Sequence, residues 1–130
     1  MKTPNPTNGE LAILRVLWSR NAPMTVRDVH RLLPNAKDTA YTTVLKMLTI
    51  MAEKGLVHRD ETERSHTYSP AQGERTVQSS LLNDLMHRAF AGSAFTLVQR
   101  ALDANNASAE ELDAIAKLIA QAKTKAKRDM

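Results

Sequence analysis

The stretch AYTTVLKMLTIMAEKGLVHRD, residues 40–60, decides the fold of this 130-residue chain. Apolar side chains recur at helical spacing along it and predict a stripe that faces a core. The stripe consists of Val44, Leu45, Leu48 and Met51. We expect Asp38 or Thr39 to cap this helix at its start, and Gly55 to end it in the left-handed conformation that glycine favours. Residues 56–60 then have the composition of a strand, so the helix leads directly into a different element.

Two shorter helices are predicted before this stretch. Thr7 and Glu10 have the spacing of a capping box and precede a first apolar stripe, which ends at Trp18. Thr25 and Asp28 repeat the cap signature before a second stripe. The stripes comprise Leu11, Leu14, Leu17 and Trp18 in the first helix, and Val26, Val29, Leu32 and Leu33 in the second. The N-terminal part of the chain therefore predicts three helices in succession.

A two-stranded hairpin is predicted after the third helix. Residues 56–60 and 66–69 are the two strands, and the polar residues 61–65 form the turn between them. Such a hairpin is only marginally stable alone, so we expect it to pack on the helices. Three helices followed by a hairpin is the order of a winged helix, a helix-turn-helix variant whose third helix enters the major groove of DNA.

The remaining residues, 71–130, have no strand signal and predict three amphipathic helices. The first ends near Gly92, the second ends at Asn105, and Ser108 caps the third. Because three short helices with broad apolar faces bury little alone, we expect a second copy of the chain to cover them. The predicted protein is mostly α with a small β-hairpin: a winged-helix DNA-binding domain over residues 1–70 and a helical dimerisation domain over residues 71–130.

The composition of the chain excludes several classes of function. It contains no cysteine, which excludes a disulfide framework, a thiolate nucleophile and every cysteine-based metal site. Its 18 Lys and Arg against 14 Asp and Glu give a net charge of +4, which mildly favours a polyanionic partner. No stretch approaches the length of an apolar membrane span, and the polar N-terminus does not have the pattern of a signal peptide. We therefore expect a cytoplasmic protein without membrane insertion.

The polar side of the predicted third helix carries the first candidate DNA-binding residues. They are Tyr41, Thr42, Thr43 and Lys46. Threonine hydroxyls can contact phosphates or base edges, the threonine methyl can meet the methyl of thymine, and lysine can reach guanine or a phosphate. No carboxylate interrupts the stretch from Thr39 until Glu53. Because a hairpin with Arg59, Arg64 and His66 follows, we predict that this face contacts double-stranded DNA.

No catalytic constellation accompanies this face. The sequence lacks a GxSxG motif, a Ser-x-x-Lys motif and a glycine-rich phosphate loop, so we expect neither catalysis nor a cofactor. His58 and His66 could face each other across the hairpin, with Asp60, Glu61 and Glu63 nearby, but isolated strand imidazoles usually face solvent and we expect no metal site. A histidine-based metal-responsive regulator remains one alternative. A winged-helix module that binds a protein instead of DNA is the other.

Five blocks of the sequence resemble the penicillinase-repressor family of bacterial transcription regulators, the BlaI/MecI/CopY type. The blocks are GELAILRVLW, MTVRDVHRLL, AYTTVLKML, AEKGLVHRD and RSHTYSP, and the resemblance is clearest over residues 9–70. It implies a homodimeric repressor whose winged helices bind a palindromic operator, with regulated genes typically concerned with β-lactam resistance, cell-wall response or copper. By position, the implied DNA-binding residues are Thr25, Arg27, Tyr41, Thr42, Thr43, Lys46, Arg64 and His66.

Two departures from the family pattern concern induction. Copper-responsive members carry C-terminal cysteine motifs, which this chain lacks, so the resemblance does not extend to copper sensing by thiolates. Antibiotic-responsive members are cut at an Asn-Phe bond by a protease that is signalled through a membrane sensor. The matching place here reads Val98-Gln99-Arg100-Ala101, without the Asn-Phe pair. The resemblance implies relief of repression by proteolysis in this region, with the bond between Arg100 and Ala101 as the candidate.

Overall fold

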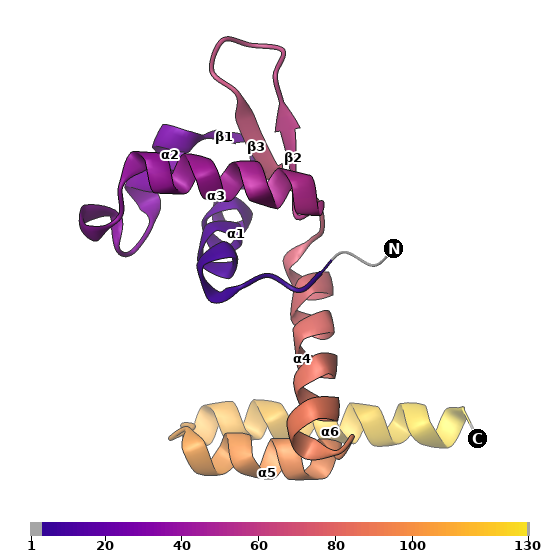
Figure 1. The fold of residues 1–130 in the computed structure, drawn as a ribbon. Helices are drawn as coiled ribbons and strands as arrows, with labels where there is room; N and C mark the ends of the chain where they lie inside the picture. Colours follow the sequence, from indigo (N-terminus) through magenta and orange to yellow (C-terminus); the bar gives the residue numbers. More distant parts are fainter. Residues whose placement is uncertain (1–3, 130) are drawn as a thin grey trace. The chain divides into compact units, whose positions relative to one another are not determined.

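The computed structural model describes residues 4–129, which form six α-helices, a short 3₁₀ helix and a three-stranded antiparallel sheet (Figure 1). The helices are α1 Asn8–Arg20, α2 Val26–Leu32, α3 Tyr41–Lys54, α4 Glu74–Phe90, α5 Ala94–Ala104 and α6 Ala109–Arg128, with the 3₁₀ helix η1 at Ala36–Asp38. The strands are β1 Met24–Thr25, β2 Val57–Asp60 and β3 Thr67–Pro70. The predicted class, mostly α with a small hairpin, is confirmed.

The chain divides into two compact units, with the boundary between Asp84 and Leu85, inside α4. The first unit holds α1 to α3, the sheet and the first turns of α4. The second holds the end of α4 with α5 and α6. The expected functional division, DNA binding by residues 1–70 and dimerisation by residues 71–130, stays a prediction.

The sheet has the order β1–β3–β2, so the returning strand of the hairpin lies in the middle. Within the hairpin, Val57 pairs with Pro70 and Arg59 pairs with Tyr68. The short strand β1 adds Met24 on the other side of Tyr68. Strand β1 was not predicted from the sequence, because two residues are too few to show an alternating pattern. By pairing with β3, β1 connects the hairpin to the start of α2.

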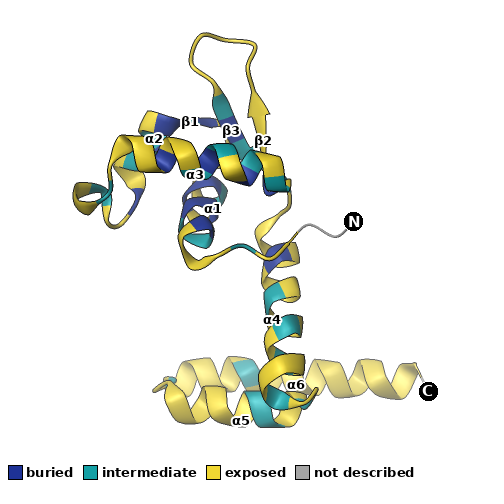
Figure 2. Ribbon diagram, viewed as in Figure 1, coloured by how far each residue is buried: buried dark blue, intermediate teal, exposed yellow. Residues whose placement is uncertain are grey.

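The core of the first unit lies between α1, α2, α3 and the sheet (Figure 2). Its fully buried side chains are Tyr68, Ile13, Leu14, Leu17, Leu48, Met51, Val29 and Val44. Two members of the predicted stripes face outward instead: Leu45 is 40% exposed and Leu32 is 37% exposed. Neither residue was distinguishable by spacing, because each adjoins buried neighbours on its helix. The core therefore uses narrower faces of α2 and α3 than the sequence predicted.

Helix caps in the first unit follow the predictions at three of four ends. The Thr7–Glu10 capping box forms, and the Thr25 hydroxyl accepts a hydrogen bond from the Asp28 backbone N–H at 3.2 Å. Gly55 ends α3 with a φ of 84°, a left-handed conformation that side chains disfavour. The prediction that Asp38 or Thr39 caps α3 is wrong. Both residues belong to the turn of η1, and α3 begins after Ala40 without a side-chain cap.

An ion pair joins the start of α1 to the end of α3. The Lys54 Nζ donates to Glu10 Oε2 at 2.8 Å, while the Thr7 backbone N–H donates to Glu10 Oε1 at 2.9 Å. The Glu10 side chain is only 6% exposed. Burial alone would raise the pKa of the Glu10 carboxyl, but the bonds from Lys54 and Thr7, with the charge of Lys54, hold that pKa below its ordinary value of 4.5.

The second unit lacks a core of its own. No residue from Leu85 to Asp129 is buried, although Leu97 and Ile115 are half-buried, and six large apolar side chains on α5 and α6 are at least two-fifths exposed (Figure 2). They include Phe95, Val98, Leu102, Leu112, Leu118 and Ile119. The predicted cap is confirmed, because the Ser108 hydroxyl accepts from the Glu111 backbone N–H at 3.1 Å. None of the helices within residues 4–129 combines the length and apolar character needed to cross a bilayer.

Candidate nucleic-acid interface

The polar face of α3 follows from the rotation that its buried residues impose. Val44, Leu48 and Met51 are fully buried at helical spacing, so they fix which side of the helix meets the core. Thr42, Thr43 and Lys46 then lie on the opposite, exposed side, as predicted. Within residues 4–129 the Lys46 ammonium has no ion-pair partner. This face therefore offers two hydroxyls and an uncompensated cation to an anionic partner.

A groove of about 600 Å³ continues this face. It is formed by the start of α2, the first turns of α3 and the end of the wing, the hairpin formed by β2 and β3. The lining residues are Thr25, Val26, Arg27, Asp28, Tyr41, Leu45, Arg64, Ser65, His66 and Tyr68. The structure thus brings together five of the eight predicted DNA-binding residues around one hollow: Thr25, Arg27, Tyr41, Arg64 and His66. The other three, Thr42, Thr43 and Lys46, line the exposed side of α3 beside it.

Positive charge dominates the lining of the groove. Arg27 and Arg64 lack an ion-pair partner among residues 4–129. Asp28, the acid in the lining, accepts from the Arg31 guanidinium at 3.2 Å, and this bond offsets its charge locally. The Thr25 hydroxyl accepts the cap hydrogen bond, so its own proton stays available for donation to a phosphate oxygen. An extended polyanion suits this combination better than a neutral ligand.

His30 fixes the position of the start of α3. Its Nε2–H donates to the Thr39 carbonyl at 2.6 Å, across the loop that separates α2 from α3. Its ring also meets the edge of the Tyr41 ring, with the centroids 6.3 Å apart at 78°. No role for His30 was predicted from the sequence. The position of His30 off the apolar stripe of α2 indicated only that its side chain does not enter the core. No pattern in the sequence predicts its hydrogen bond to Thr39.

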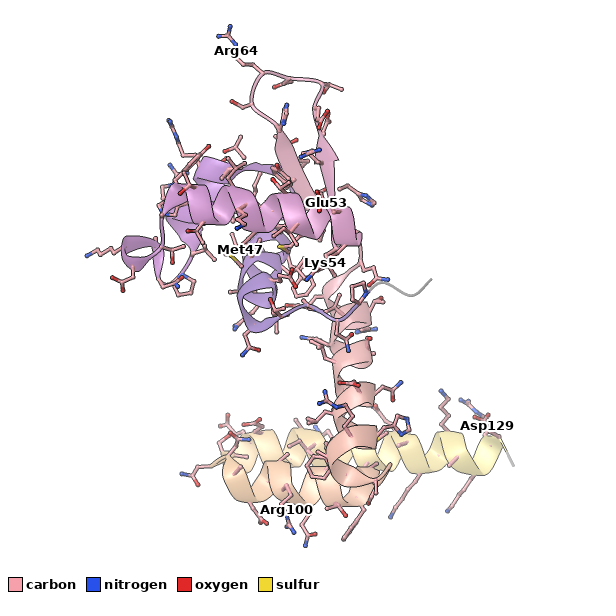
Figure 3. The ribbon with its side chains drawn as sticks, viewed as in Figure 1. Met47, Glu53, Lys54, Arg64, Arg100 and Asp129 are labelled. Carbon is pink, nitrogen blue, oxygen red and sulfur yellow. The ribbon has the colours of Figure 1, made fainter. Side chains whose placement is uncertain are left out.

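The wing carries Arg64 at its exposed turn (Figure 3). The Asp60 carboxylate organises this turn by accepting from the Thr62 backbone N–H at 2.9 Å and from the Thr62 hydroxyl at 2.7 Å. These bonds lower the pKa of Asp60, the backbone bond first. Arg59 forms an ion pair with Glu61 at 2.8 Å, whereas Arg64, the other predicted arginine of the wing, has no ion-pair partner within residues 4–129.

The alternative arrangement, in which His58 and His66 face each other across the hairpin, is wrong. His58 pairs with Ser69, and the register places Thr67 opposite Asp60, so His66 lies beyond the paired strands. The register depends on the length of the turn, and five polar residues did not specify which of them would extend the strands. No group of three metal-ligating side chains gathers within residues 4–129. The histidine-based metal alternative therefore has no geometric support in this part of the chain.

The candidate cleavage residues lie in the second unit. Arg100 and Ala101 are exposed residues in the middle of α5, and the Arg100 guanidinium lies 3.6 Å from the Asp103 carboxylate (Figure 3). A protease needs an extended backbone, so cutting this bond requires α5 to unwind locally.

The three-helix, three-strand arrangement with an exposed cationic helix defines a winged-helix protein of the helix-turn-helix class. The model of the penicillinase repressor family matches residues 6–121. The chain belongs to that family, which confirms the resemblance found in the sequence.

Two similar relatives are both described as "Transcriptional regulator BlaI", from Mycobacterium tuberculosis strains CDC 1551 / Oshkosh and ATCC 25618 / H37Rv. Each is 40% identical over 80 residues, which is 62% of this chain and 58% of the relative's length. Among solved structures, Bacillus licheniformis BlaI with the blaP half-operator aligns to 56% of this chain and 88% of that chain, at 23% identity and a TM-score of 0.47. The transcriptional regulator SlyA aligns to 92% of this chain and 74% of that chain, at 16% identity and a TM-score of 0.43.

Proposed function

We propose that this chain is a homodimeric transcriptional repressor of the cytoplasm that binds a palindromic operator in double-stranded DNA. The observation that carries the proposal is the continuous surface from Thr42, Thr43 and Lys46 on α3 into the groove that Arg27 and Arg64 line. Family membership supports the regulatory role, since the similar relatives are named transcriptional regulators.

The proposed division of labour follows from the chemistry of each side chain. Thr42, Thr43 and Lys46 enter the major groove, where hydroxyl, methyl and ammonium groups can distinguish base pairs. Arg27 and Arg64 flank α3 and bind phosphates, which supplies affinity and a steep dependence on salt. Two copies related by a two-fold axis would read two half-sites separated by about one turn of DNA or a multiple of it.

The uncovered apolar surface of the second unit supports the homodimer. Phe95 is 77% exposed and Leu118 is 63% exposed, values that a monomer in water would not retain without a functional reason. A second copy brings an identical set of apolar side chains, and an interface between identical surfaces closes into a dimer.

We propose further that proteolysis in α5 relieves repression, with a membrane sensor protease as the partner. Separation of the dimerising helices from the winged helices removes the avidity of a two-site interaction. Mass spectrometry of the protein from induced cells should show a fragment that ends at Arg100. Intact protein with an active promoter would instead indicate a ligand or a protein partner as the inducer.

The DNA-binding proposal is tested by fluorescence anisotropy with the DNA upstream of the chain's own gene and with a random duplex. We expect a sequence-selective complex that weakens steeply as salt rises. Lys46→Ala should weaken specific binding by about 1–3 kcal/mol if Lys46 reads a base. Arg15→Ala is the matched control, because Arg15 is an exposed cation of α1 outside the groove lining. Equal binding to both duplexes would refute sequence-selective operator binding, and binding to neither duplex would favour a protein-binding module.

A further inference from the structure

The last helix, α6, presents a largely uncovered apolar seam. Five residues at heptad spacing form the seam: Leu112, Ile115, Ile119, Ala122 and Ala126. Leu112 is 43% exposed and Ile119 is 50% exposed, Ile115 is half-buried, and α6 has no buried residue. Alternate steps of three and four residues keep apolar side chains on one side of a helix, which is the pattern by which two helices pair.

Side-chain size changes along this seam. Its first half has the bulky residues Leu112, Ile115 and Ile119, and its second half has only alanines. In an antiparallel pair of α6 helices, the bulky half of each copy lies against the alanine half of the other, and the volumes complement each other. In a parallel pair in register, alanine would meet alanine and leave the second half poorly filled.

Charge changes along α6 in the same way. The first turns carry Glu110, Glu111 and Asp113, and the last turns carry Lys123, Lys125, Lys127 and Arg128. None of these seven side chains has an ion-pair partner within residues 4–129. Antiparallel pairing sets each acidic end beside a basic end, whereas parallel pairing sets four cations beside four cations. The helix dipole favours the same charges on a single helix, so the size change is the independent observation.

We propose that α6 pairs with α6 of a second copy of this chain in antiparallel orientation, with Ile119 close to the two-fold axis. The proposal rests on the homodimer proposed above and adds its surface and its direction. A second copy is the occupant because the seam is complementary to itself in both size and charge. Such self-complementarity is the condition for an interface between identical surfaces.

Introduced cysteines test the direction, because the chain has none of its own. In the full-length protein under mild oxidation, Ile119→Cys should form a disulfide-linked dimer. Leu112→Cys and Ala126→Cys should each stay unlinked alone and should link to each other when the two variants are mixed. Gln121→Cys is the matched control, since Gln121 is an exposed residue on the side of α6 away from the seam.

The outcomes separate this proposal from the proposed function. Linking of Leu112→Cys alone and Ala126→Cys alone would indicate parallel pairing and overturn the proposal, while a dimer that still binds DNA would leave the function standing. Linking of Gln121→Cys as readily as Ile119→Cys would overturn the seam itself. A chain that sedimentation shows to be monomeric would overturn both the seam and the homodimer.

Charge reversal gives a second measurement on the same full chain. Reversal of the four basic residues of the last turns to Glu should raise the dimer dissociation constant at least about tenfold at low salt. Additional reversal of Glu110, Glu111 and Asp113 to Lys should restore dimerisation. The doubly reversed chain should form homodimers and avoid wild-type partners. Preferential mixing with wild-type chains would indicate parallel pairing and overturn the proposal.

Discussion

Replacement of Lys54 by methionine should destabilise the first unit mainly through the carboxylate that it leaves behind. Methionine keeps an unbranched apolar stem and removes only the ammonium that bonds Glu10 at 2.8 Å. Glu10 is 6% exposed, so its charge then keeps the Thr7 N–H as its remaining hydrogen-bond donor and little water. Loss of one partner of a buried pair costs about 3–5 kcal/mol when the other stays charged.

Protonation limits this loss. The carboxyl can take up a proton instead of staying charged, which at pH 7 costs about 3 kcal/mol from its ordinary pKa of 4.5. We therefore expect Lys54→Met to lose about 2–3 kcal/mol of unfolding free energy at pH 7. In the wild type the pKa of Glu10 is lowered, so the pair stabilises the fold above the ordinary pKa, and this contribution disappears as the pH falls through the folded-state value. The difference between variant and wild type should therefore shrink steadily as the pH falls from 7, because protonation of Glu10 in the variant costs less at lower pH, and it should be smallest below the folded-state pKa of the wild type.

Urea unfolding monitored by tryptophan fluorescence measures this loss, because Trp18 is the only tryptophan and lies on α1. Glu10→Gln is the informative comparison. It leaves a lysine that is 35% exposed and can be hydrated, so it should cost only about 1 kcal/mol. Lys37→Met, at an exposed position of η1, should stay within about 0.5 kcal/mol. Equal losses for Lys54→Met and Glu10→Gln, or a loss that persists unchanged at acid pH, would refute the reasoning.

Three further substitutions probe the remaining features. His30→Ala should weaken specific operator binding about fivefold and leave binding to random DNA almost unchanged, because it removes the contacts that hold the Thr39 carbonyl and the Tyr41 ring. Fluorescence anisotropy with both duplexes measures this, and equal weakening on both would contradict it. Gly55→Ala should cost about 1–2 kcal/mol in the same urea assay, because its φ of 84° strains a side chain; an unchanged midpoint would contradict this. Ala91→Gly should stabilise the second unit by about 0.5–1 kcal/mol, because Ala91 has a φ of 50°; a lower melting temperature by circular dichroism would count against it.

Local signals predicted most helix ends correctly. The capping box at Thr7, the cap at Thr25 and the cap at Ser108 all form because each hydroxyl satisfies a backbone N–H only three residues away. The start of α3 was wrong for the complementary reason. Asp38 and Thr39 have the chemistry of caps, but Asp38 lies in the 3₁₀ helix and Thr39 ends it, and α3 starts at Tyr41 after Ala40.

The candidate site was predictable by residue type and only partly by place. Helical spacing identified Thr42, Thr43 and Lys46, because the buried stripe of α3 dictates its opposite side. The inclusion of Leu45 in that stripe was wrong. Leu45 follows the buried Val44 on α3, but its side chain lines the groove instead of entering the core. Arg27 and Arg64 are 37 positions apart in the sequence, and only the pairing of β1 with the hairpin brings their segments together.

The sequence by itself determined the order of elements, the helix caps, the cationic face of α3 and the absence of thiol chemistry. These properties depend on neighbours within about one or two turns of the chain, so spacing and residue type are enough to predict them. Only the tertiary structure decided the Glu10–Lys54 pair, the His30 anchor and the groove. These contacts join segments that are distant in the chain, and their partners are selected by packing and burial. A periodic pattern predicts which face of a helix a side chain lies on. Only the folded structure determines which residues that side chain contacts.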